Sequence, residues 1–268
     1  GFEMDSWVLN PRLLTALREG LAPAQIVDVS TMPAQLRLVK SAAEIAYLRT
    51  AAKAAEVAMQ AAVIAAVPGA SEIDVAAAAT AALIRAGSDT PGPGVLSSGE
   101  RAHHLHGGYM HRRLEHGDTL QYEPTPHTRH YNARFMRTIK IGAASKTERS
   151  MAADLIAVQD QAIAAVAPGV PASIPDRIYR EGIVGTGLVT AYANKTFYSV
   201  GLLMPPTDAE PLEATPEAHW CFEPGMTFHT YLLVKGFGMS ETIMVTETGV
   251  ERLTNYPRAL LVGGIGIA

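Results

Sequence analysis

The sequence of 268 residues has little cysteine, no block of basic residues and no long apolar run. Its single cysteine, Cys221, excludes an internal disulfide, and the acidic N-terminus lacks the basic and apolar regions of a signal peptide. Lys and Arg total 22 against 26 Asp and Glu, which leaves no basic surface to neutralise phosphates. No apolar run approaches the roughly 20 residues that span a bilayer. We therefore expect a cytoplasmic protein without nucleic-acid or membrane partners.

Alanine-rich segments with clear start and stop signals predict the helices. Ser41 and Glu44 form a capping-box pattern that predicts a helix running to Pro68-Gly69. A second helix is expected from Ser71 or Glu72 to about Arg85. The same pattern of helix start and stop signals recurs about 100 positions later. There, helices are expected from about 147 to 168 and from about 175. The repeated PG-containing turns at 65–69 and 166–169 indicate two related halves.

Runs of β-branched and aromatic residues predict the strands. A short strand is expected at VLSS (95–98), and two more at TLQYEPT (119–125) and from 130 to 141. Further strands are expected at FYSVGLL, TFHTYLLV and ETIMVTE. Each half of the chain is thus predicted to hold two helices followed by strands.

An ordered set of motifs resembles the pita-bread superfamily of aminopeptidase P, prolidase, methionine aminopeptidase and creatinase. The motifs lie between about residues 36 and 256: LRLVKSAAEIAYLRTAA, SGERAHHLH, HGDTLQYE, FEPGMTF and ETIMVTETGVERLT. The resemblance implies an α+β pita-bread fold, with a curved, mostly antiparallel sheet, helices on its convex face and two pseudo-symmetric halves. Residues 36–268 would form the catalytic domain. Residues 1–35 resemble the last strand and helix of a creatinase-type N-terminal domain plus a linker.

The metal-ligand positions implied by this resemblance are substituted. Peptidases of the family hold two divalent metals with two Asp, a His and two Glu, and those positions here are Glu123, Arg134, Tyr198, Tyr231 and Glu241. Two carboxylates do not offset the four positive charges of two metal ions. Arg134 adds a permanent cation where a bridging carboxylate stands in the family. We therefore expect neither a metal nor another cofactor.

One active-site position of the family is retained. By resemblance, His106 stands where peptidases and creatinase place a histidine that contacts the substrate, and in creatinase this residue is thought to shuttle the proton. Glu241 and Glu123 would position water and a substrate nitrogen, and Arg134 would anchor an anion by a bidentate contact. The alternative is that Glu123, Arg134 and Glu241 form a purely structural ion cluster. Tyr198, which replaces the histidine that creatinase keeps, would orient a substrate or stabilise an oxyanion.

Three functions are compatible with this pattern. The leading hypothesis is a metal-independent, creatinase-like hydrolase that cleaves a C–N bond of a small amino-acid-like or guanidino/amide substrate. The first alternative is an Xaa-Pro-type metallopeptidase that recruits other ligands, such as His229 or His127, and the second is a non-catalytic peptide-binding protein. The expected catalytic residues are His106, Glu241 and Glu123, and the expected substrate-binding residues are Arg134, Tyr198, His229 and Tyr231. Besides its substrate, the expected partner is a second copy in a homodimer, alone or with a separate N-terminal domain fragment.

Overall fold

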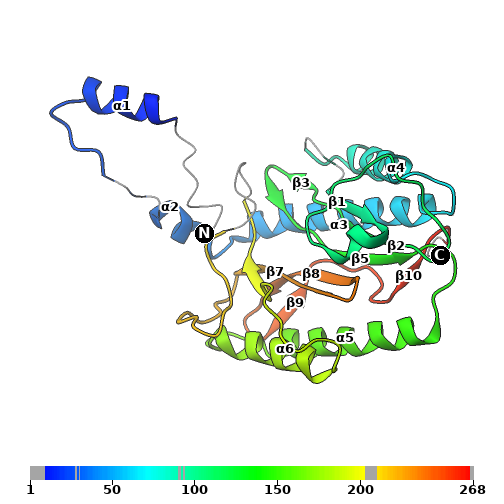
Figure 1. The fold of residues 1–268 in the computed structure, drawn as a ribbon. Coiled ribbons are helices and arrows are strands. Elements are labelled where there is room, and N and C mark those ends of the chain that lie inside the picture. The colour runs from blue at the N-terminus through cyan, green and yellow to red at the C-terminus, as the bar shows by residue number, and fades with distance from the viewer. Residues whose placement is uncertain are drawn as a thin grey trace.

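A computed structural model describes residues 10–27, 29, 31–89, 92, 94–202 and 210–265. Helices and strands alternate along the chain in the order that the motifs imply (Figure 1). The helices are α1 (Pro11–Gly20), α2 (Thr31–Arg37), α3 (Ala42–Ala65), α4 (Glu72–Arg85), the 3₁₀ helix η2 (Gly99–His103), α5 (Lys146–Ala164) and α6 (Ser173–Gly185). The strands are β1 (Val95–Ser98), β2 (Thr119–Glu123), β3 (His127–Thr128), β4 (Tyr131–Asn132), β5 (Arg137–Lys140), β6 (Phe197–Ser199), β7 (Thr227–Val234), β8 (Phe237–Val245), β9 (Val250–Arg252) and β10 (Leu261–Val262).

Capping boxes begin the three long helices. In α3, the Ser41 side chain accepts from the backbone N–H of Glu44, and the Glu44 carboxylate accepts from the backbone N–H of Ser41. The same reciprocal pair begins α4 and α5, which confirms the predicted helix starts to within about a residue. Helix α6 begins at Ser173 rather than near Pro175, because proline is tolerated in the first turn of a helix.

Eight strands form one sheet in the order β1-β2-β5-β8-β7-β6, with β9 paired to β8 and β10 to β5. All pairs are antiparallel except β10–β5. The expected strand over 130–141 is interrupted, and β4 pairs with β3 in a separate ribbon. Between β4 and β5, the backbone N–H of Arg134 donates to Thr242 Oγ1 and that of Met136 donates to Ser240 Oγ. Side chains of β8 therefore accept the hydrogen bonds of these two backbone N–H groups, in place of backbone carbonyl groups of a paired strand.

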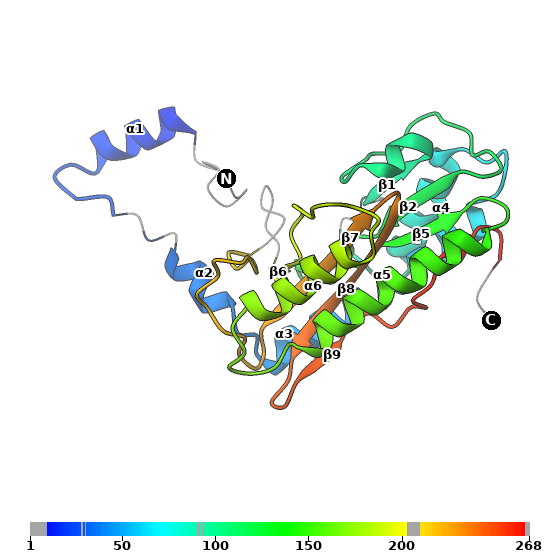
Figure 2. The ribbon, with the colours of Figure 1, turned by 60° about the horizontal axis from the view of Figure 1, so that its bottom comes forward.

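Two pairs of helices cover one face of the curled sheet (Figures 1 and 2). Helices α3 and α4 pack on β1, β2 and β5, and α5 and α6 pack on β6, β7 and β8. The two halves meet where Arg137 of β5 lies opposite Met239 of β8. Because side chains alternate along a strand, the opposite, concave face is lined by the intervening residues. The expected α+β pita-bread fold is confirmed.

The described part of residues 1–35 contains helix α1 and the start of α2, and no strand. Helix α1 has no buried residue and lies apart from the sheet in both ribbon views (Figures 1 and 2). Residues 1–9, 28 and 30 lie outside the described residues, so the expected strand of an N-terminal domain stays a prediction. Nothing among the described helices is both long and apolar enough to span a membrane.

Candidate functional site

The concave face gathers six of the seven expected site residues. His106, Glu123, Tyr198, His229 and Tyr231 line one small cavity, and Arg134 lies beside Glu123 at its edge. Four further residues complete the lining: Val95, Leu105, Gln121 and Met136. Strand alternation explains the convergence, because Glu123 at the end of β2 and the His229–Tyr231 pair of β7 all point away from the helices.

Glu123 stands at the centre of the charged contacts. Its Oε1 atom lies 3.6 Å from Arg134 Nε and 3.7 Å from His229 Nε2, both longer than a direct hydrogen bond. The side chains of Glu123 and Arg134 are each 10% exposed. Burial raises the pKa of Glu123, although Arg134 and His106 favour its charged form. Glu123 is thus a buried carboxylate whose pKa lies above its ordinary value because of burial.

His229 links Glu123 to Tyr198. The imidazole is 1% exposed, and its Nδ1 atom lies 2.6 Å from the hydroxyl of Tyr198. Burial lowers the pKa of His229 well below its ordinary value, and the nearby Arg134 and His106 lower it further. His229 is therefore neutral near pH 7, with one ring nitrogen as donor and the other as acceptor.

Aromatic side chains form the remaining wall. The Tyr198 ring packs edge-on against His229 and Tyr231, at centroid distances of 5.1 and 6.0 Å. The guanidinium carbon of Arg134 lies 5.4 Å from the centre of the same ring. Burial, followed by the charge of Glu123, raises the pKa of Tyr231 to about 12. The tyrosine is thus a neutral hydroxyl group near pH 7.

His106 reaches the cavity from a loop rather than from the sheet. It follows η2 with a positive φ of 61°, and its side chain is exposed while it lines the cavity. The next residue, Gly107, is tightly packed, since a Cβ there would lie 2.5 Å from Ser97 Cβ. This close approach holds the loop against β1 and places His106 at the mouth of the cavity.

Glu241 is not part of this site, and the alternative, a structural Glu123–Arg134–Glu241 ion cluster, does not form. In the β7–β8 register Tyr231 lies opposite Ser240, so Ser240 shares the concave face and Glu241 points to the helix-covered face. There Glu241 Oε1 accepts from Arg137 Nη2 and Arg258 Nη1, each at 2.7 Å, and Oε2 accepts from Thr254. The Glu123–Arg134 contact is the part of the expected cluster that the structure contains.

Sequence reasoning also missed Gln121, which lines the cavity, and Ser240, which shares the concave face. Gln121 precedes Glu123 by two residues on β2, so strand alternation alone would have placed both side chains on one face. Ser240 needed the register of the β7–β8 hairpin, which a one-residue shift reverses. His127, considered as a substitute metal ligand, lies in β3 opposite Asn132 and does not contribute to the cavity lining.

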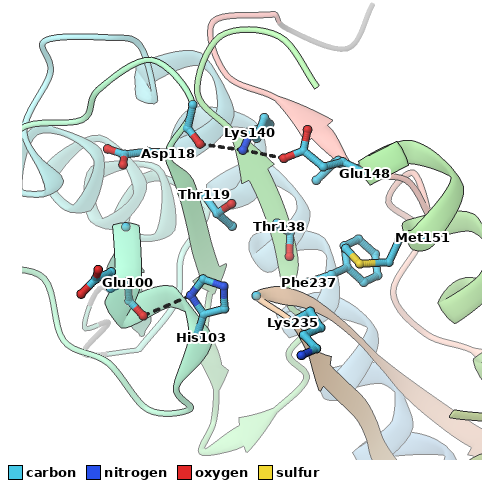
Figure 3. Close-up of a pocket in the computed structure, with 14 residues that line it drawn as sticks. Glu100, His103, Asp118, Thr119, Thr138, Lys140, Glu148, Met151, Lys235 and Phe237 are labelled. Carbon is cyan, nitrogen blue, oxygen red and sulfur yellow. Dashed lines mark hydrogen bonds and ion pairs between the residues drawn. The ribbon is translucent and has the colours of Figure 1, made fainter. Parts of the chain in front are cut away.

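A larger pocket of about 380 Å³ lies where β2 begins and β5 ends (Figure 3). Its charged groups include Lys140, whose Nζ donates to Gly117 O and lies 2.6 Å from Glu148 Oε1. His103 Nδ1 contacts the carbonyl of Glu100 within η2 (Figure 3). These contacts stabilise the pocket wall, and none of the expected site residues lines it.

The model of the metallopeptidase family M24 matches residues 46–247, which is most of the chain. The chain belongs to this family. It is 29% identical to the uncharacterized hydrolase/peptidase y4tM of Sinorhizobium fredii, over 98% of this chain and 69% of that protein. It is 28% identical to the Xaa-Pro dipeptidase of Pyrococcus furiosus, over 84% of this chain and 66% of that protein. The chain thus spans about two thirds of the length of these relatives.

Solved structures share the fold. The prolidase from Pyrococcus furiosus superposes with a TM-score of 0.85 at 24% identity, covering 94% of this chain and 75% of that one. The dipeptidase PepE from Mycobacterium ulcerans gives a TM-score of 0.84 at 26% identity, covering 96% and 69%. These similarities agree with the curled sheet and its two pairs of helices.

The donor groups of this cavity do not fit the dinuclear metal site of the family. Of the five positions that the resemblance assigns to metal ligands, Glu123 alone brings a carboxylate to the concave face. Arg134 places a guanidinium next to it, and Tyr198 and Tyr231 bring hydroxyl groups. No group of three or more His, Cys, Asp or Glu suited to a metal occurs among the described residues. A single carboxylate beside a fixed cation does not match the charge of two divalent ions.

Proposed function

We propose that the chain is a hydrolase that cleaves a C–N bond of a small amino-acid-like or guanidino/amide substrate without a metal. The observation that carries this proposal is the convergence of His106, Glu123 and Arg134 from three separate segments on one concave cavity. Membership of M24, and relatives named as hydrolases, peptidases and Xaa-Pro dipeptidases, support hydrolysis as the reaction type.

Each of the three residues takes a role that its position allows. Arg134 anchors an anionic group of the substrate, because its guanidinium remains charged. Glu123 accepts a proton from water as the water adds to the substrate carbon, and it releases this proton to solvent after the product leaves. His106, at the exposed mouth, donates a proton to the leaving nitrogen and is reprotonated from solvent. Glu241, which contacts Arg137 and Arg258 on the other face, has no catalytic role.

A substrate panel with matched histidine variants tests this function. The panel contains Xaa-Pro dipeptides, guanidino acids, cyclic amidines and N-acyl amino acids. His106→Ala should lower the turnover number at least about a hundredfold with little change in melting temperature. His104→Ala, which removes another exposed histidine of the same loop, is the control and should keep its activity. The proposal is wrong if no panel member is hydrolysed, in which case a binding role replaces it.

Metal analysis separates this function from the metallopeptidase alternative. We expect less than about 0.2 equivalents of any transition metal per chain after gentle purification, because the cavity presents one carboxylate and a guanidinium. Elemental analysis by mass spectrometry makes the measurement. About two equivalents of Mn, Co, Zn or Fe, together with loss of hydrolysis on chelation, would favour the metallopeptidase.

A further inference from the structure

A buried carboxylate outside the cavity holds the segment that carries His106. Glu72 is the first residue of α4 and has no exposed surface. Its Oε1 atom accepts from the backbone N–H of Ser98 at 2.8 Å and from the Ser98 hydroxyl. Its Oε2 atom accepts from the backbone N–H of Met110 at 2.6 Å. One carboxylate thus joins the first and last residues of the segment 98–110, which we call the histidine loop.

Arg101 adds a second link across the histidine loop. Its Nη2 atom donates to both carboxylate oxygens of Glu72, and its Nη1 atom donates to the carbonyl oxygen of Gly108 at 2.8 Å. The guanidinium therefore supplies the counter-charge that a buried carboxylate needs. It also connects Glu72 to the backbone just beyond His106.

The backbone conformation of His106 requires such support. Its φ of 61° lies in the left-handed region, which residues other than glycine seldom occupy. A residue persists there only where the surrounding structure holds it. Glu72 fixes both ends of the histidine loop, and the link from Arg101 to Gly108 encloses His106.

The start of α4 does not account for the carboxylate of Glu72. Ser71 and Asp74 form the capping box of this helix, each side chain accepting from the backbone N–H of the other. Glu72 lies between them, and its carboxylate contacts the histidine loop instead. A residue without a carboxylate at position 72 would keep the capping box, so this buried charge serves the loop.

We propose that Glu72 is a positioning residue for His106. Through its bonds to the histidine loop it holds the imidazole at the mouth of the cavity, where His106 donates a proton to the leaving nitrogen. This inference rests on the proposed function and adds to it a residue that acts through the loop backbone. Since proton transfer depends on distance and direction, a looser loop should slow the chemical step and leave substrate binding unchanged.

A double-mutant cycle with His106 tests this role on the panel member that the wild type hydrolyses fastest. Glu72→Gln keeps the side-chain length but replaces one carboxylate oxygen by an NH₂ group, which cannot accept a hydrogen bond. We expect it to lower kcat at least about tenfold with little change in KM. In the His106→Ala background the same substitution should change kcat by less than about twofold, because no imidazole remains to be positioned.

Backbone dynamics test the same role without turnover. Order parameters of residues 105–107 from ¹⁵N NMR relaxation should fall from about 0.85 in the wild type to below about 0.6 in Glu72→Gln. Asp176→Asn is the matched control, because Asp176 also has no exposed surface and lies in the first turn of α6. It accepts from Arg180 and Thr196 in the other half of the chain, so its loss should leave residues 105–107 unchanged.

A second variant removes one link and leaves Glu72 in place. Arg101→Lys keeps a positive charge beside the carboxylate, but an ammonium group lacks the fork that binds Glu72 and Gly108 together. We expect lower order parameters for residues 105–107 and a lower kcat, again only where His106 is present. This variant provides the test if Glu72→Gln does not fold.

Three results would each overturn the positioning role. They are an equal decrease in kcat with and without His106, unchanged order parameters in both variants, and the same loss of order in Asp176→Asn. The two measurements also separate this role from the proposed function. A histidine loop that loosens in a protein that hydrolyses no panel member rejects the hydrolase alone. A His106-dependent hydrolase whose kcat is unaffected by either variant rejects the positioning role alone.

Discussion

Replacing Glu241 by alanine should destabilise the fold strongly, because Glu241 neutralises buried cations. Its side chain and that of Arg137 have no exposed surface, and Arg258 is 10% exposed. Glu241→Ala leaves the guanidinium of Arg137 buried without its counter-charge, a change that typically costs about 3–5 kcal/mol. Carbonyl oxygens of Ser240, Tyr256 and Pro257 also accept from Arg137, so the guanidinium is held in place after the substitution.

The expected change in melting temperature follows from the size of the chain. At about 2.1 cal/mol/K per residue, 268 residues give an unfolding entropy of about 0.56 kcal/mol/K. A loss of 3–5 kcal/mol therefore lowers the melting temperature by about 5–9 °C. Differential scanning calorimetry of the purified variant measures this change directly.

Glu251→Ala provides the control for this experiment. Glu251 lies on the neighbouring strand β9 and pairs with Arg49, but the two side chains are 40% and 47% exposed. An exposed pair contributes at most about 1 kcal/mol, so this variant should melt within about 2 °C of the wild type. If Glu241→Ala also melts within 2 °C and instead loses activity, then Glu241 is a catalytic residue and the structural assignment is refuted.

Three further predictions concern charge and assembly. Arg134→Ala should weaken binding of a carboxylate-bearing ligand by about 2–4 kcal/mol in a calorimetric titration, and unchanged affinity would exclude anion anchoring. The Lys140 hydrogen bond, followed by those of Ser145, lowers the pKa of Glu148 to about 2, below its value near 4.3 in the unfolded chain. That stabilisation is present above pH 4.3 and is lost as the pH falls toward 2. The melting temperatures of wild type and Glu148→Gln should therefore differ by about 2 °C at pH 6 and converge as the pH falls toward 2. We propose a homodimer burying more than about 1,500 Å², and a monomer by light scattering at micromolar concentration would contradict it.

Helix boundaries were predictable from the sequence because local chemistry determines them. Ser41, Ser71 and Ser145 each stand three residues before an acidic side chain, and the structure contains all three capping boxes. Strand boundaries were less predictable between residues 130 and 141. There the backbone N–H groups donate hydrogen bonds to the side chains of Ser240 and Thr242, more than 100 residues away along the chain. The local sequence does not predict such distant partners.

The site was predictable where motif spacing identifies strand positions. Glu123, Tyr198 and Tyr231 were each assigned from a motif, and strand geometry brings them to one cavity. Glu241 was misplaced because adjacent residues on a strand face opposite sides, and pairing with Tyr231 identifies Ser240 as the position on the concave face. Gln121 was overlooked because it is uncharged, although its position two residues before Glu123 places it on the same face of β2.

The guanidinium of Arg134, 3.6 Å from the Glu123 carboxylate, is a positive charge that is covalently part of the chain. A metal ion at such a place is acquired from solution and exchanges with it, so the charge of the site depends on the metals available. Arg134 is present from the moment the protein folds and remains protonated at physiological pH. The positive charge that Arg134 places beside Glu123 is therefore encoded in the gene itself.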